Sequence, residues 1–140
     1  MLKQILFGGE SGLSFIGNAG IALLRIFAGA SLSLAHGFGK IPVQEKFIEG
    51  TANLGFPLPT FFAWAAALSE FLGGAFLALG LFTRLSGLFI AVTMFVAAFI
   101  ANGGKGFEKQ ELALFYLVVG LLFLLKGAGD WSLDAFLRKK

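Results

Sequence analysis

Two opposite charges lie inside otherwise apolar stretches of the chain, and they are the first candidates for chemistry. Arg25 is the one formal charge between residues 16 and 36, and Glu70 is the one charge between residues 57 and 83. A charged side chain near the middle of a membrane-spanning helix is costly unless it faces protein or a partner. Each side chain therefore marks either a ligand site or a structural contact between helices.

Helix geometry predicts that the two charges lie at the same depth. Each is about 11 residues from the connection between their helices, which is roughly 16 Å at 1.5 Å per residue. Gly29 lies on the helix face of Arg25, and Gly73 and Gly74 lie on that of Glu70. Small residues let two helix backbones approach closely. We therefore predict that Arg25 and Glu70 form an ion pair, which either only sets helix register or lines a polar cavity.

Two further side chains are candidates for such a cavity. His36 lies at the end of the first apolar stretch, on the same helix face as Arg25. Tyr116 lies in the last apolar stretch and is the most notable of the remaining polar groups. A lone histidine at a helix end is more often an interface residue than a ligand, and a lone hydroxyl is more often satisfied within its own helix. The candidate ligand-binding residues are therefore Arg25, His36, Glu70 and Tyr116.

The composition is that of a membrane protein. Of the 140 residues, 57% are hydrophobic and 14% are charged, whereas a soluble domain has about 25% charged residues. The net charge of +3 is modest, and the basic residues form no stripe or motif for nucleic acid. With no cysteine and one histidine, the chain offers no thiol chemistry and no evident metal-ligand set. We expect membrane lipid around the protein, no nucleic-acid partner, no metal and no intrinsic cofactor.

Four apolar segments are long enough to cross a membrane, because a hydrocarbon core about 30 Å thick needs around 20 mostly apolar helical residues. The turn at residues 82–84 is so short that the helices on either side must be antiparallel neighbours. The stretch 43–52 and the chain ends, residues 1–16 and 130–140, are expected to form short interfacial segments. We predict an all-α fold, an integral membrane four-helix bundle in a single domain of residues 1–140, with helices at about 16–36, 59–82, 85–102 and 110–126.

Segments across most of residues 21–136 carry a family resemblance. They read LLRIFAGASLSLAHGFGKI at 23–41, GFPLP at 55–59, LSEFLGGAFLALGLFTRLSGL at 68–88 and GAGDWSLD at 127–134. In their order and spacing they resemble the DoxX family of small bacterial membrane proteins. The resemblance implies a four-helix membrane bundle and, as functions, subunits of quinone-linked oxidoreductases such as thiosulfate:quinone oxidoreductase, or membrane partners of redox-stress enzymes. The matching positions are Arg25, His36, Gly37, Lys40, Glu70, Gly73, Gly74, Gly80, Thr83, Arg84 and Glu111.

Among these positions, five are expected to have structural or turn roles: Gly73, Gly74, Thr83, Arg84 and Glu111. Four spans would place both termini on the same side of the membrane. Basic residues are in excess on the side that holds the termini: Lys3, Arg84, Lys126, Arg138, Lys139 and Lys140 lie there, against Lys40, Lys46, Lys105 and Lys109 on the other. Because basic residues mark the cytoplasmic side, we expect a multi-pass protein of the bacterial inner membrane with cytoplasmic termini.

Three functions remain open at this stage. The first is an accessory membrane subunit of a redox-associated complex, which contacts a quinone through the buried polar site and docks a protein partner. The second is a structural or assembly subunit without a ligand of its own. The third is a pathway for a small solute or for protons, which would need a homo-oligomer because four short helices leave little room within one protomer.

Overall fold

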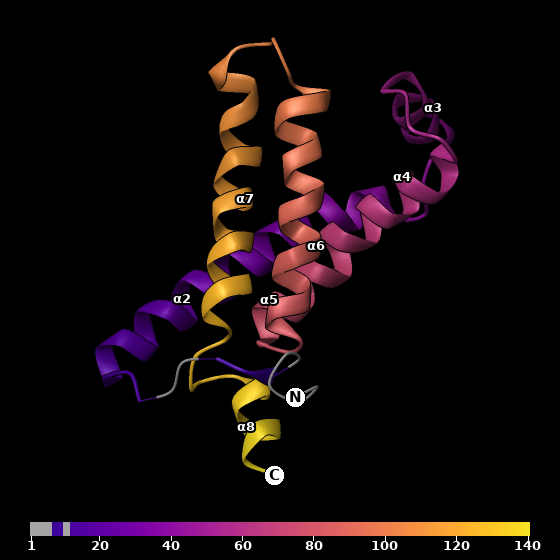
Figure 1. Ribbon diagram of the computed structural model, residues 1–140. Coiled ribbons are helices and arrows are strands. Elements are labelled where there is room, and N and C mark those ends of the chain that lie inside the picture. Colours follow the sequence, from indigo (N-terminus) through magenta and orange to yellow (C-terminus); the bar gives the residue numbers. More distant parts are fainter. Residues whose placement is uncertain (1–6, 10–11) are drawn as a thin grey trace.

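The computed structural model describes residues 7–9 and 12–140, and all regular structure in this part of the chain is helical. Helices of very different length alternate with short turns, and Figure 1 shows their arrangement. The predicted all-α class is thus confirmed. The predicted interfacial segment at residues 1–16 falls partly outside the described residues, as does Lys3.

The first long helix begins at α2 (Phe15–Ser31), where the Ser14 hydroxyl accepts a hydrogen bond from the Gly17 N–H. Such a serine satisfies one of the free N–H groups of a helix start. The helix continues through the π-helical turn η1 (Leu32–Gly37) and the 3₁₀ turn η2 (Phe38–Lys40), giving 26 residues. The predicted end at residue 36 is therefore wrong. The helix stops only before Pro42, because the residue preceding a proline is pushed into extended backbone, as Ile41 is here.

The second long helix follows the short amphipathic helix α3 (Glu45–Asn53). The segment expected at residues 43–52 is therefore mostly helical, and its interfacial position stays a prediction. The second long helix comprises α4 (Pro59–Leu68), the π-helical turn η3 (Ser69–Gly73) and α5 (Gly74–Leu79). Pro59 occupies the first turn, where its missing N–H costs nothing. The helix ends at Gly80, which adopts a positive φ of 67°, a conformation that glycine adopts readily.

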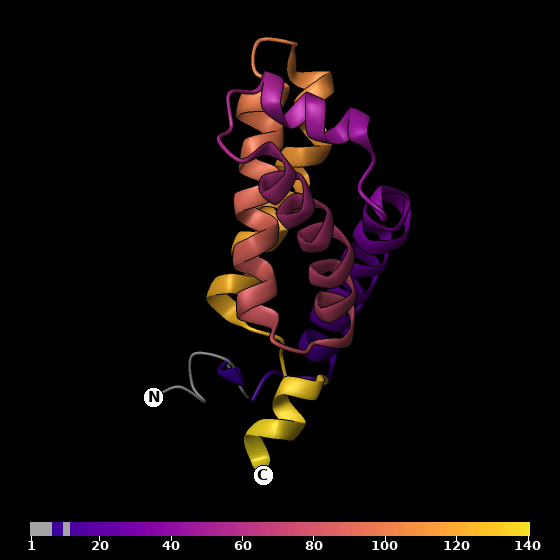
Figure 2. The same ribbon diagram turned by 90° about the vertical axis from the view of Figure 1, so that its right-hand side faces the viewer.

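The remaining helices complete the fold. They are α6 (Thr83–Phe95), extended by the π-helical turn η4 (Val96–Ala101), then α7 (Phe107–Lys126) and the short α8 (Leu133–Lys139). Figures 1 and 2 show α6 and α7 as an antiparallel pair, with α2 and the α4–α5 helix crossing beside it. The turn lies at residues 80–82, slightly before the predicted 82–84, and the predicted antiparallel arrangement of the helices on either side is confirmed.

Glycines set the closest approaches between the helices. A Cβ placed on Gly29 in α2 would lie 2.6 Å from the Gly74 carbonyl oxygen, and one on Gly74 would lie 2.8 Å from the Gly29 oxygen. In the same way, a Cβ on Gly87 in α6 would lie 2.6 Å from the Gly120 oxygen in α7, and one on Gly120 would lie 2.8 Å from the Gly87 oxygen. Real Cβ atoms do not come this near to another backbone, so both pairs of helices require glycine at their crossing. The core that these crossings enclose includes Leu32, Leu77, Ile90 and Phe123.

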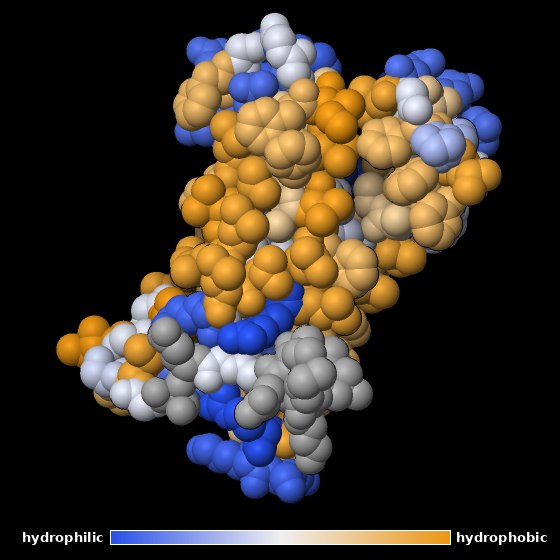
Figure 3. Space-filling model, in the orientation of Figure 1, coloured by the Kyte–Doolittle hydropathy of each residue, from blue (hydrophilic) through white to orange (hydrophobic). Residues whose placement is uncertain are grey.

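The outer surface of the long helices is apolar. Figure 3 shows a hydrophobic region over α6, α7 and part of α4, with hydrophilic residues gathered at the two ends of the molecule. Within the described residues, three helices are long and apolar enough to cross a membrane: Phe15–Lys40, Pro59–Leu79 and Thr83–Ala101. The 20 residues of α7 do not meet the same criteria, because Glu108, Lys109 and Glu111 lie in its first turns and Lys126 at its end.

Candidate functional site

The site is built where two π-helical turns, η1 and η3, cross. Gly37 in η1 lies directly against the backbone of Glu70 and Phe71, and any Cβ there would overlap the Phe71 nitrogen. The Ser33 hydroxyl donates a hydrogen bond of 2.8 Å to the Phe71 carbonyl oxygen. π-Helical turns are rare and often occur at functional sites. Here they bring the end of the first long helix onto the middle of the second.

Glu70 is paired with Lys40 at this crossing. The Lys40 ammonium donates to Oε1 of Glu70 at 2.7 Å and to Oε2 at 2.5 Å. Glu70 is 5% exposed, and 34% of the Lys40 side chain remains exposed. The ring of Phe47 in α3 lies 5.3 Å from the Lys40 nitrogen, so α3 flanks the ion pair. The buried carboxylate thus has a charged partner that reaches it from the helix end.

The predicted ion pair between Arg25 and Glu70 is therefore wrong. The guanidinium of Arg25 instead donates to three backbone carbonyls: Nη1 to Leu77 at 2.9 Å and Ala78 at 2.6 Å, and Nη2 to Trp131 at 2.8 Å. Leu77 and Ala78 are at the end of α5, where the last carbonyls carry the negative end of the helix dipole. Arg25 is 2% exposed and joins the C-terminal segment to the first two long helices.

The error lies in the register of the two helices. Gly29 packs against Gly74 and Ala78, and Gly37 packs against Glu70, so Glu70 is level with residues near the end of η1 and not with Arg25. The prediction assumed that the first helix ends at residue 36 and that this end is level with the start of the second helix. In the structure the first helix is longer, and the first turns of α4 extend past it to pack against α3.

Two more of the predicted residues meet near this ion pair. The rings of His36 and Tyr116 are in edge-to-face contact with centroids 5.8 Å apart. Tyr116 also shares a hydrogen bond with the Ser31 side chain and lies near enough to Glu70 to experience its charge. We name His36, Lys40, Glu70 and Tyr116 the Glu70 cluster. It unites three of the four predicted ligand-binding residues and replaces Arg25 by Lys40.

The predicted structural residues have separate places. Gly74 makes the close approach to α2, whereas a Cβ on Gly73 would have room. Thr83 is fully buried at the start of α6, and its N–H donates to the Asp134 carboxylate at 2.9 Å. Arg84 donates to the Leu125 carbonyl at 3.1 Å, and Glu111 is exposed in the first turns of α7.

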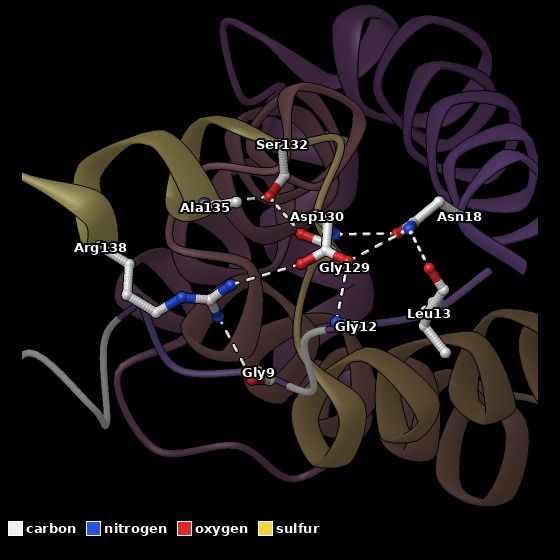
Figure 4. A network of polar contacts seen from close by, with 9 residues as sticks. All are labelled: Gly9, Gly12, Leu13, Asn18, Gly129, Asp130, Ser132, Ala135 and Arg138. Atoms are coloured by element: carbon white, nitrogen blue, oxygen red, sulfur yellow. Dashed lines mark hydrogen bonds and ion pairs between the residues drawn. The ribbon is translucent and has the colours of Figure 1, made fainter. Parts of the chain in front are cut away.

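Sequence reasoning missed the aspartates of the C-terminal segment. Asp134 accepts from the N–H groups of Phe82 and Thr83 and so caps α6. Figure 4 shows Asp130 between Asn18, the Gly12 N–H and Arg138. The hydrogen bond from the Asn18 side chain, followed by that from Gly12 and the charge of Arg138, lowers the pKa of Asp130. The segment GDWSLD carries both aspartates, but its sequence does not reveal their backbone partners.

Comparisons with known proteins agree with this architecture. A family model described as DoxX matches residues 20–103. The chain is 30% identical over 121 residues to a Bacillus subtilis (strain 168) protein named "Putative oxidoreductase CatD", covering 86% of this chain and 88% of that protein. It is 33% identical over 134 residues to an uncharacterized Haemophilus influenzae protein, an alignment that covers 86% of this chain and 92% of that protein. No solved structure matches the chain significantly.

Proposed function

Because the chain belongs to the DoxX family of membrane proteins, we propose that it is an accessory membrane subunit of a redox-associated complex and that it contacts a quinone at the Glu70 cluster. The observation that carries this proposal is the buried carboxylate of Glu70, held by an ammonium that is itself one-third exposed. The name of the Bacillus subtilis relative, an oxidoreductase, supports the redox association. The redox partner would be another protein, which this chain docks.

The donors in the cluster suit a carbonyl oxygen. A lysine ammonium has three N–H donors, and Glu70 takes two of them. The third is available to an acceptor on the exposed side of Lys40. A quinone, when bound, supplies two carbonyl oxygens and accepts electrons and protons. Lys40 would hold one oxygen, and Glu70 would fix the ammonium in place.

His36 and Tyr116 extend the cluster on the α7 side. Both side chains can donate and accept protons, and their edge-to-face contact fixes the orientation of the two rings. The hydrogen bond between Tyr116 and Ser31 restricts the hydroxyl further. In this proposal the pair moves protons to or from the ligand oxygen, as positioned general acids and bases do.

Quinone titration of the purified protein tests the proposal. A water-soluble short-chain quinone is added to protein in detergent, and binding is followed by isothermal calorimetry. Glu70→Gln and Lys40→Met should each weaken binding by about tenfold or more, as expected when a charge-assisted hydrogen bond of about 1.5–3 kcal/mol is lost. Glu49→Gln and Lys46→Met, on exposed positions of α3, are the matched controls. Equal affinity in all five proteins would reject the quinone site.

The membrane arrangement is part of the same proposal. We place α7 across the membrane as the fourth span of a four-helix bundle, because its Leu-, Phe- and Val-rich stretch after Glu111 packs along α6. The bilayer would be the bacterial inner membrane, with the C-terminal segment and its basic residues on the cytoplasmic side. Cysteine labelling from either side at position 139 would test the orientation, since the chain has no cysteine of its own.

A second candidate function is a structural subunit, and Arg25 is the observation that favours it. Its guanidinium bonds to three backbone carbonyls of the protein itself, so this charge serves the fold and no ligand is needed to explain it. If Lys40 and Glu70 were equally structural, the double variant Lys40→Met/Glu70→Leu would fold and still co-purify with the partner complex at full activity. Loss of activity in a folded, partner-bound double variant would favour the quinone site.

A further inference from the structure

A groove on the opposite side of η3 contains an unpartnered hydroxyl. The groove has a volume of about 320 Å³ and runs between the second long helix and α6. Its outer edge includes Leu68 and Leu72, which are 38% and 41% exposed, and Phe89, which is 54% exposed. Ser69 and Gly73, both buried, lie deeper. The groove is therefore open to whatever surrounds the helices.

The hydroxyl of Ser69 has no hydrogen-bond partner among the residues that the structure describes. Its Oγ is buried, and the residue as a whole is 8% exposed. A serine inside a helix usually bonds to the carbonyl four residues earlier, and a buried hydroxyl left without a partner is unfavourable. Ser69 lines the groove, and rotation of its side chain to another staggered rotamer can turn the hydroxyl toward an acceptor on a molecule inside it.

The space beside this hydroxyl is empty because residue 73 is glycine. A Cβ on Gly73 would lie 4.0 Å from the Ser69 Oγ and 3.5 Å from the Ile90 side chain, which are ordinary contact distances. The remaining walls include the buried Ser86 and are otherwise apolar and partly aromatic, with Phe76 and Phe82 near the turn. A volume of this size is at the lower end of the range for small-molecule sites, about 300–1,000 Å³.

We propose that this groove binds an apolar, ring-sized compound dissolved in the membrane, whose single carbonyl oxygen accepts a hydrogen bond from Ser69. Ser69 is in the middle of the Pro59–Leu79 helix, whereas the ester carbonyls of lipids lie at the bilayer surface. A lipid chain alone would leave the hydroxyl unpaired. The site is separate from the Glu70 cluster, because Glu70 bonds to Lys40 on the α2 side and Ser69 lines the α6 side.

A second groove provides an internal control. It has a volume of about 420 Å³, lies between the α6–η4 helix and α7, and is lined by residues such as Val92, Phe95 and Leu121. None of its lining residues has a polar side chain. It should take up apolar molecules without regard to a carbonyl group.

Photo-labelling with benzophenone tests the proposal on the full chain in lipid vesicles. Benzophenone is apolar, carries one carbonyl and attaches to nearby C–H groups on illumination, and peptide mass spectrometry locates the attachment. In a competition experiment, 9-fluorenone should reduce the labelling of Leu68, Leu72 or Phe89 at about a fivefold lower concentration than fluorene, which lacks the carbonyl oxygen. One neutral hydrogen bond accounts for a factor of about this size. Labelling of the second groove should show no such preference.

The variant Ser69→Ala should abolish the preference for fluorenone while leaving the labelling itself. The protein should still fold, because the substitution removes an unsatisfied group and no hydrogen bond. Gly73→Ala is a second variant, which fills the space beside the hydroxyl and should reduce labelling there. Equal displacement by the two competitors in the unchanged protein, or a preference that survives Ser69→Ala, would overturn the proposal. Neither result bears on quinone binding at Lys40 and Glu70.

Discussion

The ammonium of Lys40 bonds to both carboxylate oxygens of Glu70, at 2.7 and 2.5 Å, across the crossing of η1 and η3. The two partners are unequally buried, with Glu70 5% exposed and the Lys40 side chain 34% exposed. The buried carboxylate therefore needs the ammonium to compensate its charge, whereas the partly exposed ammonium needs the carboxylate less. Replacing one partner should have a different effect from replacing both.

Lys40→Met should destabilise the protein by about 3 kcal/mol, because it leaves the Glu70 carboxylate buried without a partner. The double variant Lys40→Met/Glu70→Leu should recover most of this loss, since no buried charge remains. Equilibrium unfolding in mixed micelles measures both, with Lys46→Met as the control for a lost surface lysine. A double variant less stable than Lys40→Met alone would contradict this account of the pair.

Gly29→Ala should destabilise the protein by about 1–3 kcal/mol, the usual cost of overpacking. Its Cβ would lie 2.5 Å from the Ala78 nitrogen and 2.6 Å from the Gly74 oxygen, both of them rigid backbone atoms. Gly20→Ala in the same helix is the matched control, because no atom of the described residues lies within 4 Å of its Cβ. Thermal unfolding of the two variants compares them. Similar melting temperatures would show that the helices do not approach as closely as described.

Arg25→Met should loosen the C-terminal segment. The change removes the side-chain donor from the carbonyls of Ala78, Trp131 and Leu77, of which Leu77 keeps a hydrogen bond from the Gly80 N–H. Each buried carbonyl left without any donor costs about 1–3 kcal/mol. Hydrogen exchange of the α8 amides should accelerate, while that of α7 changes little. Arg84→Met, which removes one exposed hydrogen bond, is the control. Unchanged exchange in α8 would mean that the contacts of Asp130 and Asp134 hold the segment without Arg25.

Acid should release the contacts around Asp130. Hydrogen bonds from Asn18 and Gly12 and the charge of Arg138 lower its pKa in the folded protein. A lowered pKa stabilises the fold at any pH above the ordinary value of 3.8, and this stabilisation is lost as the pH falls through the folded value. NMR of the Gly12 amide should show its hydrogen bond breaking below pH 3.8. In Asp130→Asn the same signal should lack this titration.

Hydropathy and glycine spacing predicted most of the helices and their close approaches. The long helices form from the apolar stretches, and the second of them begins at Pro59. Gly29 and Gly74 allow two helix backbones to approach closely, as predicted from their small size. The partner of Glu70 was not predictable in this way, because it depends on the register of two helices. A helix end at residue 40 in place of 36, with α4 extending past it, moves Glu70 from Arg25 to Lys40.

The partners of Arg25 could not be predicted from the sequence, for a different reason. They are backbone carbonyls, and any residue type can supply a carbonyl, so no pattern of side chains marks them. The same holds for the N–H groups that bind Asp134. The sequence shows a charge that needs a partner, but only the fold shows that the partner is a helix end.

The most direct test of a quinone-contacting role is extraction of the gently purified protein with organic solvent, followed by mass spectrometry. We predict a near-stoichiometric quinone in the unchanged protein and in Glu49→Gln, and its loss in Glu70→Gln and Lys40→Met when all are folded. A protein that carries no quinone, or the same amount in all four forms, would contradict the proposal. The Lys40–Glu70 pair would then be a structural contact between two helices.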